Sequence, residues 1–353
     1  MKTAQSSSTI RPFKRTARLL ATAGIATVAV LLAACSAGGG TPDEGGPSAG
    51  SGSASGIKVV VMGGAPDDPF WSKMKNGAEA AGATISAAGG SVEVVSMPGY
   101  ENFNSDAAKL VANIDAMNPS AVVLPNWVPE AQNDNIKTLT DKGIPVIIYN
   151  AGQATIDEVG ARMYIGTDEY QSGVLTGRQL ADDGARNVVC VNTLPGTANI
   201  EDRCKGVQDG AEAGGATSSN LNLPSTQFGD PTAITQAIKG TLLQDSSIDA
   251  VVAVGAADGD SAAAAIEQNG VADSVQLAAF DFNAAALERI TAGTQAFAVD
   301  LQPYAQAFYA TSAAFQLAAY GIELPEPVFL AGPSLITADN VELVNEAVKN
   351  GIR

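Results

Sequence analysis

The chain has 353 residues, of which 46% are apolar and 5% aromatic, and its formal net charge is −17. This length and apolar content predict a globular protein with room for two domains and substantial cores. The first 34 residues hold five cations and no acid, and the rest of the chain carries a net charge near −22. Such a charge disfavours binding to nucleic acid or to anionic lipid surfaces. The sequence contains no histidine, which excludes histidine-based catalytic triads and His-ligated metals.

Residues 1–34 are typical of a secretion signal, with a cationic start followed by an apolar stretch at 19–32. That stretch is too short and too rich in Ala and Thr for a spanning helix. It ends in Leu32-Ala33-Ala34-Cys35, which resembles the bacterial lipobox. The resemblance implies cleavage before Cys35 and lipidation of its sulfur, and the alternative is an ordinary signal peptide with an incidental cysteine. Residues 35–56 are rich in Gly, Ser and Pro, which predicts a flexible tether.

From residue 57 onward, short apolar strands alternate with helical patterns, which predicts parallel sheets covered by helices on both faces. About ten strands are too many for one small domain, so two similar α/β lobes are expected. We expect strands at 58–62, 92–97, 121–124, 146–149, 163–165, 187–192, 220–223, 250–254, 276–280 and 296–300. We expect helices from Trp71 to Ala81 and at 106–117, 130–142, 169–183, 203–213, 231–243, 260–269, 284–292 and 303–320.

The loop after the first strand holds a Gly63-Gly64 turn, two acids and two aromatic residues. In open α/β sheets, loops at the carboxyl ends of the strands bind ligands. Neither this turn nor the segment 255–259 has the spacing of a dinucleotide or phosphate loop, and nearby acids would repel phosphate. Whether Asp67 or Asp68 faces a ligand stays open.

Polar or aromatic side chains follow several other strands in the same way. Carboxylates and amides bind vicinal hydroxyls, and aromatic faces cover the C–H face of a sugar, so this set predicts a site for a neutral polyhydroxylated ligand. The alternative for each residue is a helix cap, a turn or a core position. The candidates are Asp68, Phe70, Trp71, Asn126 with Trp127, Asn150, Asn199, Arg203, Asp258, Asp281, Asp300 and Gln302.

Cys190 and Cys204 are the cysteines that remain after Cys35, and they lie on an expected strand and helix. In an oxidising compartment they would form a disulfide, and the alternative is two buried thiols. Their spacing is not that of a redox-active CxxC pair. No compact acidic loop with calcium-binding spacing occurs. We therefore expect neither a metal nor a cofactor.

Over about residues 57–353, the sequence resembles the ribose-type (class I) periplasmic sugar-binding proteins of ABC importers. Asp68-Pro69-Phe70-Trp71 follows the first strand, where the ribose binder has Asn-Pro-Phe-Phe. The other segments that carry the resemblance are GIPVIIYNAG, YIGTDEYQSG, VNTLPGTANIEDRCKGV, AAFDF and AVDLQPYAQAF.

The resemblance implies two Rossmann-like lobes joined by a three-crossover hinge, the type I periplasmic-binding-protein fold. The N-terminal lobe would comprise 57–166 and 301–328, and the C-terminal lobe 167–300 and 329–353. Phe70 and Trp71 match an aromatic pair that stacks on the sugar, and Asp281 matches an Asp that pairs with ring hydroxyls.

Other positions depart from the ribose pattern, which points to other monosaccharides or to sugar alcohols. Asn150 stands where the ribose binder has Asp. Gly255-Ala256 replace an Asn-Asp pair of the ribose binder, for which Asp258 would be the substitute. Arg203 lies beside a sugar-binding Arg, but the register that aligns Gly206 puts Glu201 there, which would leave Arg203 as an ion-pairing residue. Asp300 and Gln302 fall near the hinge Gln of the ribose binder.

The resulting expectation is a monomeric, lipid-anchored solute-binding protein that closes on a neutral sugar or polyol. Its partners would be a transmembrane permease and a cytoplasmic ATPase, and it would contact the membrane only through its anchor. One alternative is a sensor that presents the same closed form to a receptor or kinase. Another is a carbohydrate-cleaving enzyme that uses Asp281 and Asp300 as its acid and base, against which the resemblance to a binding family argues.

Overall fold

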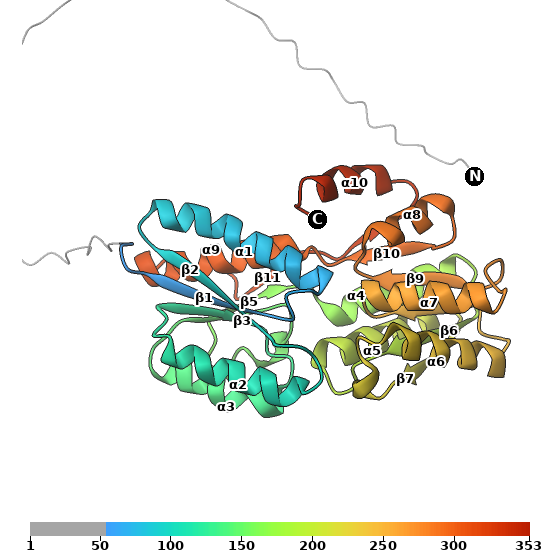
Figure 1. Cartoon of the computed structure of the whole chain (residues 1–353), viewed down its shortest axis with the longest axis horizontal. Coiled ribbons are helices and arrows are strands. Elements are labelled where there is room, and N and C mark those ends of the chain that lie inside the picture. The colour runs from blue at the N-terminus through green and yellow to red at the C-terminus, as the bar shows by residue number, and fades with distance from the viewer. Residues whose placement is uncertain (1–53) are drawn as a thin grey trace, which may run out of the picture. The chain divides into compact units, whose positions relative to one another are not determined.

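The computed structural model describes residues 54–353, so the expected signal segment, Cys35 and most of the tether lie outside the described residues. The described part contains two six-stranded sheets, each covered by helices on both faces (Figure 1). Every strand pair is parallel except β10 with β12, where the chain runs back along the edge of the second sheet. The α/β class and the two parallel-sheet lobes are therefore confirmed.

The first lobe holds a sheet in the order β11-β5-β4-β3-β1-β2. Its inner strands β3 and β4 are short apolar runs without alternation, because both of their faces are buried. Figure 1 shows α1 and α9 on one face and α2 and α3 on the other. The strands are β1 (Lys58–Gly63), β2 (Ser91–Ser96), β3 (Ala121–Leu124), β4 (Val146–Tyr149), β5 (Met163–Gly166) and β11 (Val328–Leu330); the helices are α1 (Pro69–Ala87), α2 (Phe103–Ala116), α3 (Pro129–Asp141) and α9 (Pro303–Tyr320).

The second lobe holds a sheet in the order β12-β10-β9-β8-β6-β7. Along β6, Val188 and Cys190 pack in the core under α4 and α5, whereas Val189 and Val191 pack in the core under α6 and α7. The strands are β6 (Asn187–Asn192), β7 (Thr217–Asn222), β8 (Ala250–Ala253), β9 (Gln276–Phe280), β10 (Phe297–Asp300) and β12 (Ser334–Ile336); the helices are α4 (Glu169–Asp182), α5 (Ala198–Ala213), α6 (Pro231–Gln244), α7 (Ala256–Gln268), α8 (Ala284–Ala292) and α10 (Val341–Lys349).

Helices α4 and α5 approach each other through glycines spaced four residues apart on both helices. A Cβ at Gly173 would collide with the carbonyl oxygen of Arg203, and a Cβ at Gly206 would collide with that of Tyr170. The structure also joins Cys190 on β6 to Cys204 on α5 in a disulfide. Helix α5 is thus fixed to both its neighbouring helix and its own sheet, which positions the polar residues near its start.

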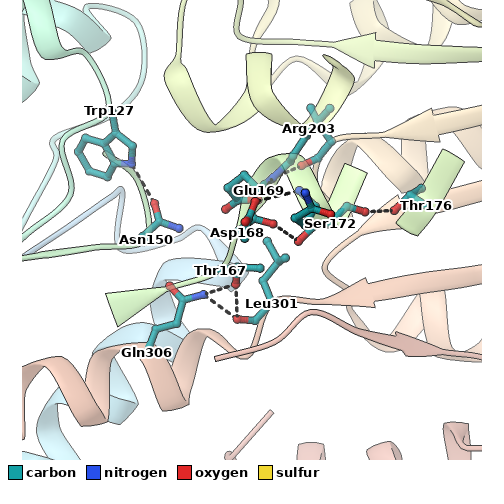
Figure 2. Close-up of polar contacts among 12 residues, drawn as sticks. Trp127, Asn150, Thr167, Asp168, Glu169, Ser172, Thr176, Arg203, Leu301 and Gln306 are labelled. Carbon is teal, nitrogen blue, oxygen red and sulfur yellow. Dashed lines mark hydrogen bonds and ion pairs between the residues drawn. The ribbon is translucent and has the colours of Figure 1, made fainter. Parts of the chain in front are cut away.

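Three crossovers connect the lobes, and the side chain of Thr167 links all of them. Thr167 follows β5, and its hydroxyl lies 3.3 Å from the carbonyl oxygen of Leu301, which follows β10, and 3.2 Å from that of Ala331, between β11 and β12. The hydroxyl also accepts a hydrogen bond of 3.1 Å from the amide nitrogen of Gln306, which donates to Leu301 as well (Figure 2). The hinge is therefore one hydrogen-bonded unit.

Some elements differ from the expectation. Helix α5 begins at Ala198 rather than at 203, because the carboxylate of Glu201 reaches back to the Gly196 amide and supports an earlier start. The short elements β11, β12 and α10 were not expected. The lobe boundary expected at 328 falls at the first residue of β11, whose register with β5 extends to Leu330. Strand β7 starts at Thr217, and its polar sequence fits its place at the edge of the sheet.

Candidate functional site

A cleft of about 800 Å³ lies between the lobes, at the carboxyl ends of the strands of both sheets. This is the size and place expected of a small-molecule site in open α/β sheets. The cleft brings together nine of the sequence-predicted residues: Asp68, Phe70, Trp71, Trp127, Asn150, Asn199, Arg203, Asp258 and Asp281. A second cavity, of about 590 Å³, lies between α9 and β11 and contains none of them.

An aromatic wall lines the first-lobe side of the cleft. The rings of Phe70 and Trp71 meet edge to face at 5.1 Å between centroids, and Trp71 meets Trp127 in the same way at 5.2 Å. Trp71 is only 9% exposed because its indole lies over the Gly63-Gly64 turn, where a Cβ at Gly64 would collide with it. The glycine turn thus makes room for an indole, and Phe70 is the more accessible ring of the pair.

Asp68 begins α1 as its N-cap, and both of its carboxylate oxygens are engaged. One accepts from the backbone amide of Phe70 at 2.9 Å, and the other accepts from the hydroxyl of Tyr100 at 2.7 Å. Burial raises the pKa of Asp68, and these hydrogen bonds work against that rise. Its side chain therefore holds Tyr100 at the cleft, and any ligand contact would use the remaining lone pairs.

Asn150 lies directly after β4 in the left-handed backbone region, with a φ of 63°. Its side-chain oxygen accepts from the indole nitrogen of Trp127 at 3.2 Å (Figure 2). The hydroxyl of Tyr164 contacts its backbone carbonyl at 2.9 Å. The side chain is almost fully buried, and its amide nitrogen has no partner within residues 54–353. Asn150 is thus oriented by its neighbours with a donor left for a ligand.

Arg203 on α5 forms a buried ion pair with Glu169 on α4. Its Nε and Nη2 donate to the two oxygens of Glu169 at 2.7 and 2.9 Å (Figure 2). Its Nη1 donates to the carbonyl oxygen of Val254 at 2.8 Å. Burial raises the pKa of Glu169, and the arginine counteracts that rise. Arg203 lines the cleft, but its geometry is that of an ion-pairing residue, the second of the two roles considered from the sequence.

Two acids of the second lobe face the cleft from the ends of β8 and β9. Burial raises the pKa of Asp258 to about 7, although its carboxylate accepts from the hydroxyl of Thr193 at 2.9 Å. Burial also raises the pKa of Asp281 to about 7, against the effect of Arg203 and Lys73, and no hydrogen bond to its carboxylate occurs within residues 54–353. These acids are suited to accept hydrogen bonds from ligand hydroxyls.

Asn199 supplies a further polar group near the start of α5. Its side chain lines the cleft and is 8% exposed, and its buried oxygen has no hydrogen-bond partner in the described part of the chain. A buried polar atom without a partner is costly unless something else satisfies it. Together with Asn150 and Asp281 it forms a set of groups that a hydroxylated ligand would pair.

Three predicted residues do not line the cleft. Asn126 is fully buried and donates to Asn133 and Thr155, each at 2.8 Å, so it stabilises the loops behind the site. Asp300 is fully buried too; it accepts from the backbone amide of Gln302 at 2.8 Å and pairs with Arg353 at 3.0 Å. Gln302 begins α9 in the left-handed region at the second crossover. Asn126 and Asp300 thus have partners within the protein, and none of the three residues is available to a ligand in the cleft.

Sequence reasoning missed several cleft residues. Tyr100 follows β2, so the rule that found the other strand-end residues would have found it as well. Phe228 comes from the loop after the weakly predicted β7, and its ring meets that of Tyr100 at 4.9 Å across the cleft. Lys73 lies one turn along α1 from Phe70 and carries no local signal for a role in the site.

Within residues 54–353, no group of three or more His, Cys, Asp or Glu side chains is arranged to hold a metal ion. Nor does any helix there combine the length and apolarity needed to cross a membrane.

Two α/β lobes, a three-crossover hinge and a polar and aromatic cleft define a periplasmic-type binding protein. The family model described as "Periplasmic binding protein domain" matches residues 59–322, and the chain belongs to this family. Family membership implies an extracytoplasmic location.

Among curated proteins, the chain is similar to the xylose/arabinose-binding protein XylF of Sulfolobus acidocaldarius. The two are 27% identical over 210 residues, which is 55% of this chain, and the chain spans about half (50%) of that relative's length.

Among solved structures, a carbohydrate transporter from Acidothermus cellulolyticus 11B in complex with myo-inositol superposes with a TM-score of 0.76. It is 26% identical, and the match covers 84% of this chain and 100% of that one. The periplasmic ribose ABC transporter from Conexibacter woesei has a TM-score of 0.71, an identity of 21%, and coverages of 86% and 99%. At that identity the second match supports the fold alone.

Proposed function

We propose that this protein is the extracytoplasmic solute-binding protein of an ABC importer and that it captures a monosaccharide or sugar alcohol by cleft closure. The proposal rests on the composition of the cleft. The cleft sets aromatic faces on the first lobe opposite unpaired polar groups on the second, namely the carboxylate of Asp281 and the amide oxygen of Asn199. A pyranose or cyclitol offers the complementary apolar face and ring of hydroxyls.

The ligand class is supported by relatives whose names state sugars or a cyclitol, chiefly the myo-inositol complex at 26% identity. Closure would bring the two halves of the site together around the ligand, and a permease would recognise the closed form. The same residues bind rather than cleave in this proposal. Asp281 and Asp300, the acid pair that an enzyme would need, do not meet in the cleft, because only Asp281 lines it.

A thermal-shift panel of pentoses, hexoses, inositols, alditols, nucleosides and amino acids tests the assignment. A ligand at 100-fold excess over its Kd adds about 2.7 kcal/mol to the free energy of unfolding. We expect a shift for at least one sugar or sugar alcohol, and loss of that shift in Asp281→Ala. A shift with nucleosides or amino acids alone would rule out the sugar assignment.

We also propose that lipid on Cys35 keeps the protein at the outer face of the cell membrane, because two or three acyl chains anchor a protein stably. The sequence Leu32-Ala33-Ala34-Cys35 supports this. Cell fractionation of a Cys35→Ser variant is the test. The variant should leave the membrane fraction, and its retention there would contradict the anchor.

A further inference from the structure

Lys73 reaches from the first lobe to the second across the cleft. It lies on α1, and its ammonium nitrogen donates a hydrogen bond of 2.9 Å to the backbone carbonyl oxygen of Phe282, just beyond β9. The same nitrogen lies 4.0 Å from the centroid of the Phe282 ring. Outside the hinge, this is the one side-chain hydrogen bond within residues 54–353 that joins the two lobes.

The contact is made by protein atoms alone. Phe282 offers a main-chain carbonyl and a ring that is almost fully buried, so its position is set by the second lobe and not by a ligand. A hydrogen bond from an ammonium group to a carbonyl is stronger than a neutral one, and an aromatic face adds attraction to the cation. This contact therefore stabilises the closed arrangement of the lobes, whatever occupies the cleft.

The surrounding charges favour the ammonium at this place. The carboxylates of Asp281 and Asp300 in the second lobe and of Asp68 in the first all interact favourably with it. Burial opposes them and lowers the pKa of Lys73. The attraction to Asp281 and Asp300 is present only when the lobes are close, so these acids strengthen the same cross-lobe contact.

We propose that Lys73 is a positioning residue that latches the two lobes together and thereby sets the fraction of molecules in the binding-competent closed form. Apparent affinity scales with that fraction, so the latch tunes affinity without selecting the ligand. This inference depends on the proposed closure of the cleft, but the latch is a property of the ligand-free protein.

The test uses the ligand-free full chain. Hydrogen–deuterium exchange is followed at Ala198, whose backbone amide bonds across the cleft to the carbonyl oxygen of Trp127 at 3.3 Å. Small-angle scattering gives the radius of gyration of the same samples. In Lys73→Met, which keeps the apolar stem, we expect exchange at Ala198 to be about 3- to 10-fold faster and the radius of gyration to be larger.

The matched control is Lys75→Met on the same helix, because Lys75 is half exposed and its ion pair is with Glu79 on the same helix. It should behave as the wild type, and amides of β3 should keep their protection in both variants, which shows that the first lobe stays folded. Lys73→Arg keeps the charge and the hydrogen-bond donors, so exchange at Ala198 in this variant should stay as slow as in the wild type. Unchanged exchange and size in Lys73→Met would overturn the latch, as would an equal change in Lys75→Met. Because no sugar is used, failure here is distinct from failure of the sugar assignment.

Discussion

Arg203 and Glu169 form a two-pronged ion pair in which both side chains are only 5% exposed. Removing one member of such a pair leaves an unpaired charge in the interior, which is costlier than removing both. We expect Glu169→Gln to lower the free energy of unfolding by about 3–5 kcal/mol in urea denaturation. The double variant Glu169→Leu, Arg203→Met should lose much less. A single variant as stable as the wild type would show that the pair does not hold α4 and α5 together.

The two adjacent aromatic residues at the start of α1 should respond differently to truncation. Phe70 is half-buried and packs against apolar clusters of both lobes, whereas Trp71 is nearly buried within the first lobe. We expect Phe70→Ala to weaken sugar binding in calorimetric titration with a modest loss of stability. Trp71→Ala should weaken binding and also cost about 3–5 kcal/mol of stability. Unchanged affinity in Phe70→Ala would remove that ring from the ligand site.

Gly64 should be intolerant of even one extra carbon, because its Cβ would occupy the space of the Trp71 indole. We expect Gly64→Ala to displace that ring, to lower stability by about 1–3 kcal/mol, and to alter the tryptophan fluorescence. Gly240→Ala on α6 is the control, because a Cβ there meets nothing within 4 Å and should stabilise the helix by about 1 kcal/mol. Equal effects of the two substitutions would contradict the close packing of Trp71 on the turn.

The raised pKa values of Asp258 and Asp281 predict opposite pH trends for stability and binding. Both are about 7 in the folded protein against an ordinary value of 3.8, so the folded state binds more protons between these limits. The free energy of unfolding should therefore fall as pH rises from about 4 to 7 and then level off. If ligand hydroxyls donate to the Asp281 carboxylate, affinity should increase as pH rises through 7.

The variant Asp281→Asn tests this pH dependence. Urea midpoints at pH 5 and pH 8 should differ less in the variant than in the wild type, because one of the protonating groups is gone. The same substitution should flatten the pH dependence of affinity. A variant that keeps the full wild-type slope in both would show that Asp281 does not titrate in this range.

The sequence predicted most of the fold because buried parallel strands leave an unmistakable pattern of short apolar runs between capped helices. Strands β3, β4 and β9 begin and end at the expected residues. The elements β11, β12 and α10 are short, and their placement depends on pairing with β5 and β10, which lie far away in sequence. No local pattern indicates such pairing.

From the sequence, the site could be predicted only for residues that directly follow a strand. Asp258 and Asp281 reach the cleft because the carboxyl ends of parallel strands meet at one edge of a sheet. Asn126 and Asp300 occupy equivalent positions in sequence, but the turn geometry directs them to backbone and side-chain partners instead. The contact of Lys73 with Phe282 joins residues 209 apart and depends on how the lobes meet, which no sequence pattern encodes.

The three crossovers have a consequence for biosynthesis. The first lobe is not a continuous stretch of chain, because its sheet receives the edge strand β11 only at Val328–Leu330. Its helix α1 also packs against the late helix α9, so closely that a Cβ at Gly77 would collide with Tyr304. A growing chain that has emerged as far as the end of the second sheet's β10 still lacks this helix and strand. The N-terminal lobe must then complete itself around segments that arrive last, and premature termination before residue 303 would leave its apolar face uncovered and prone to aggregate.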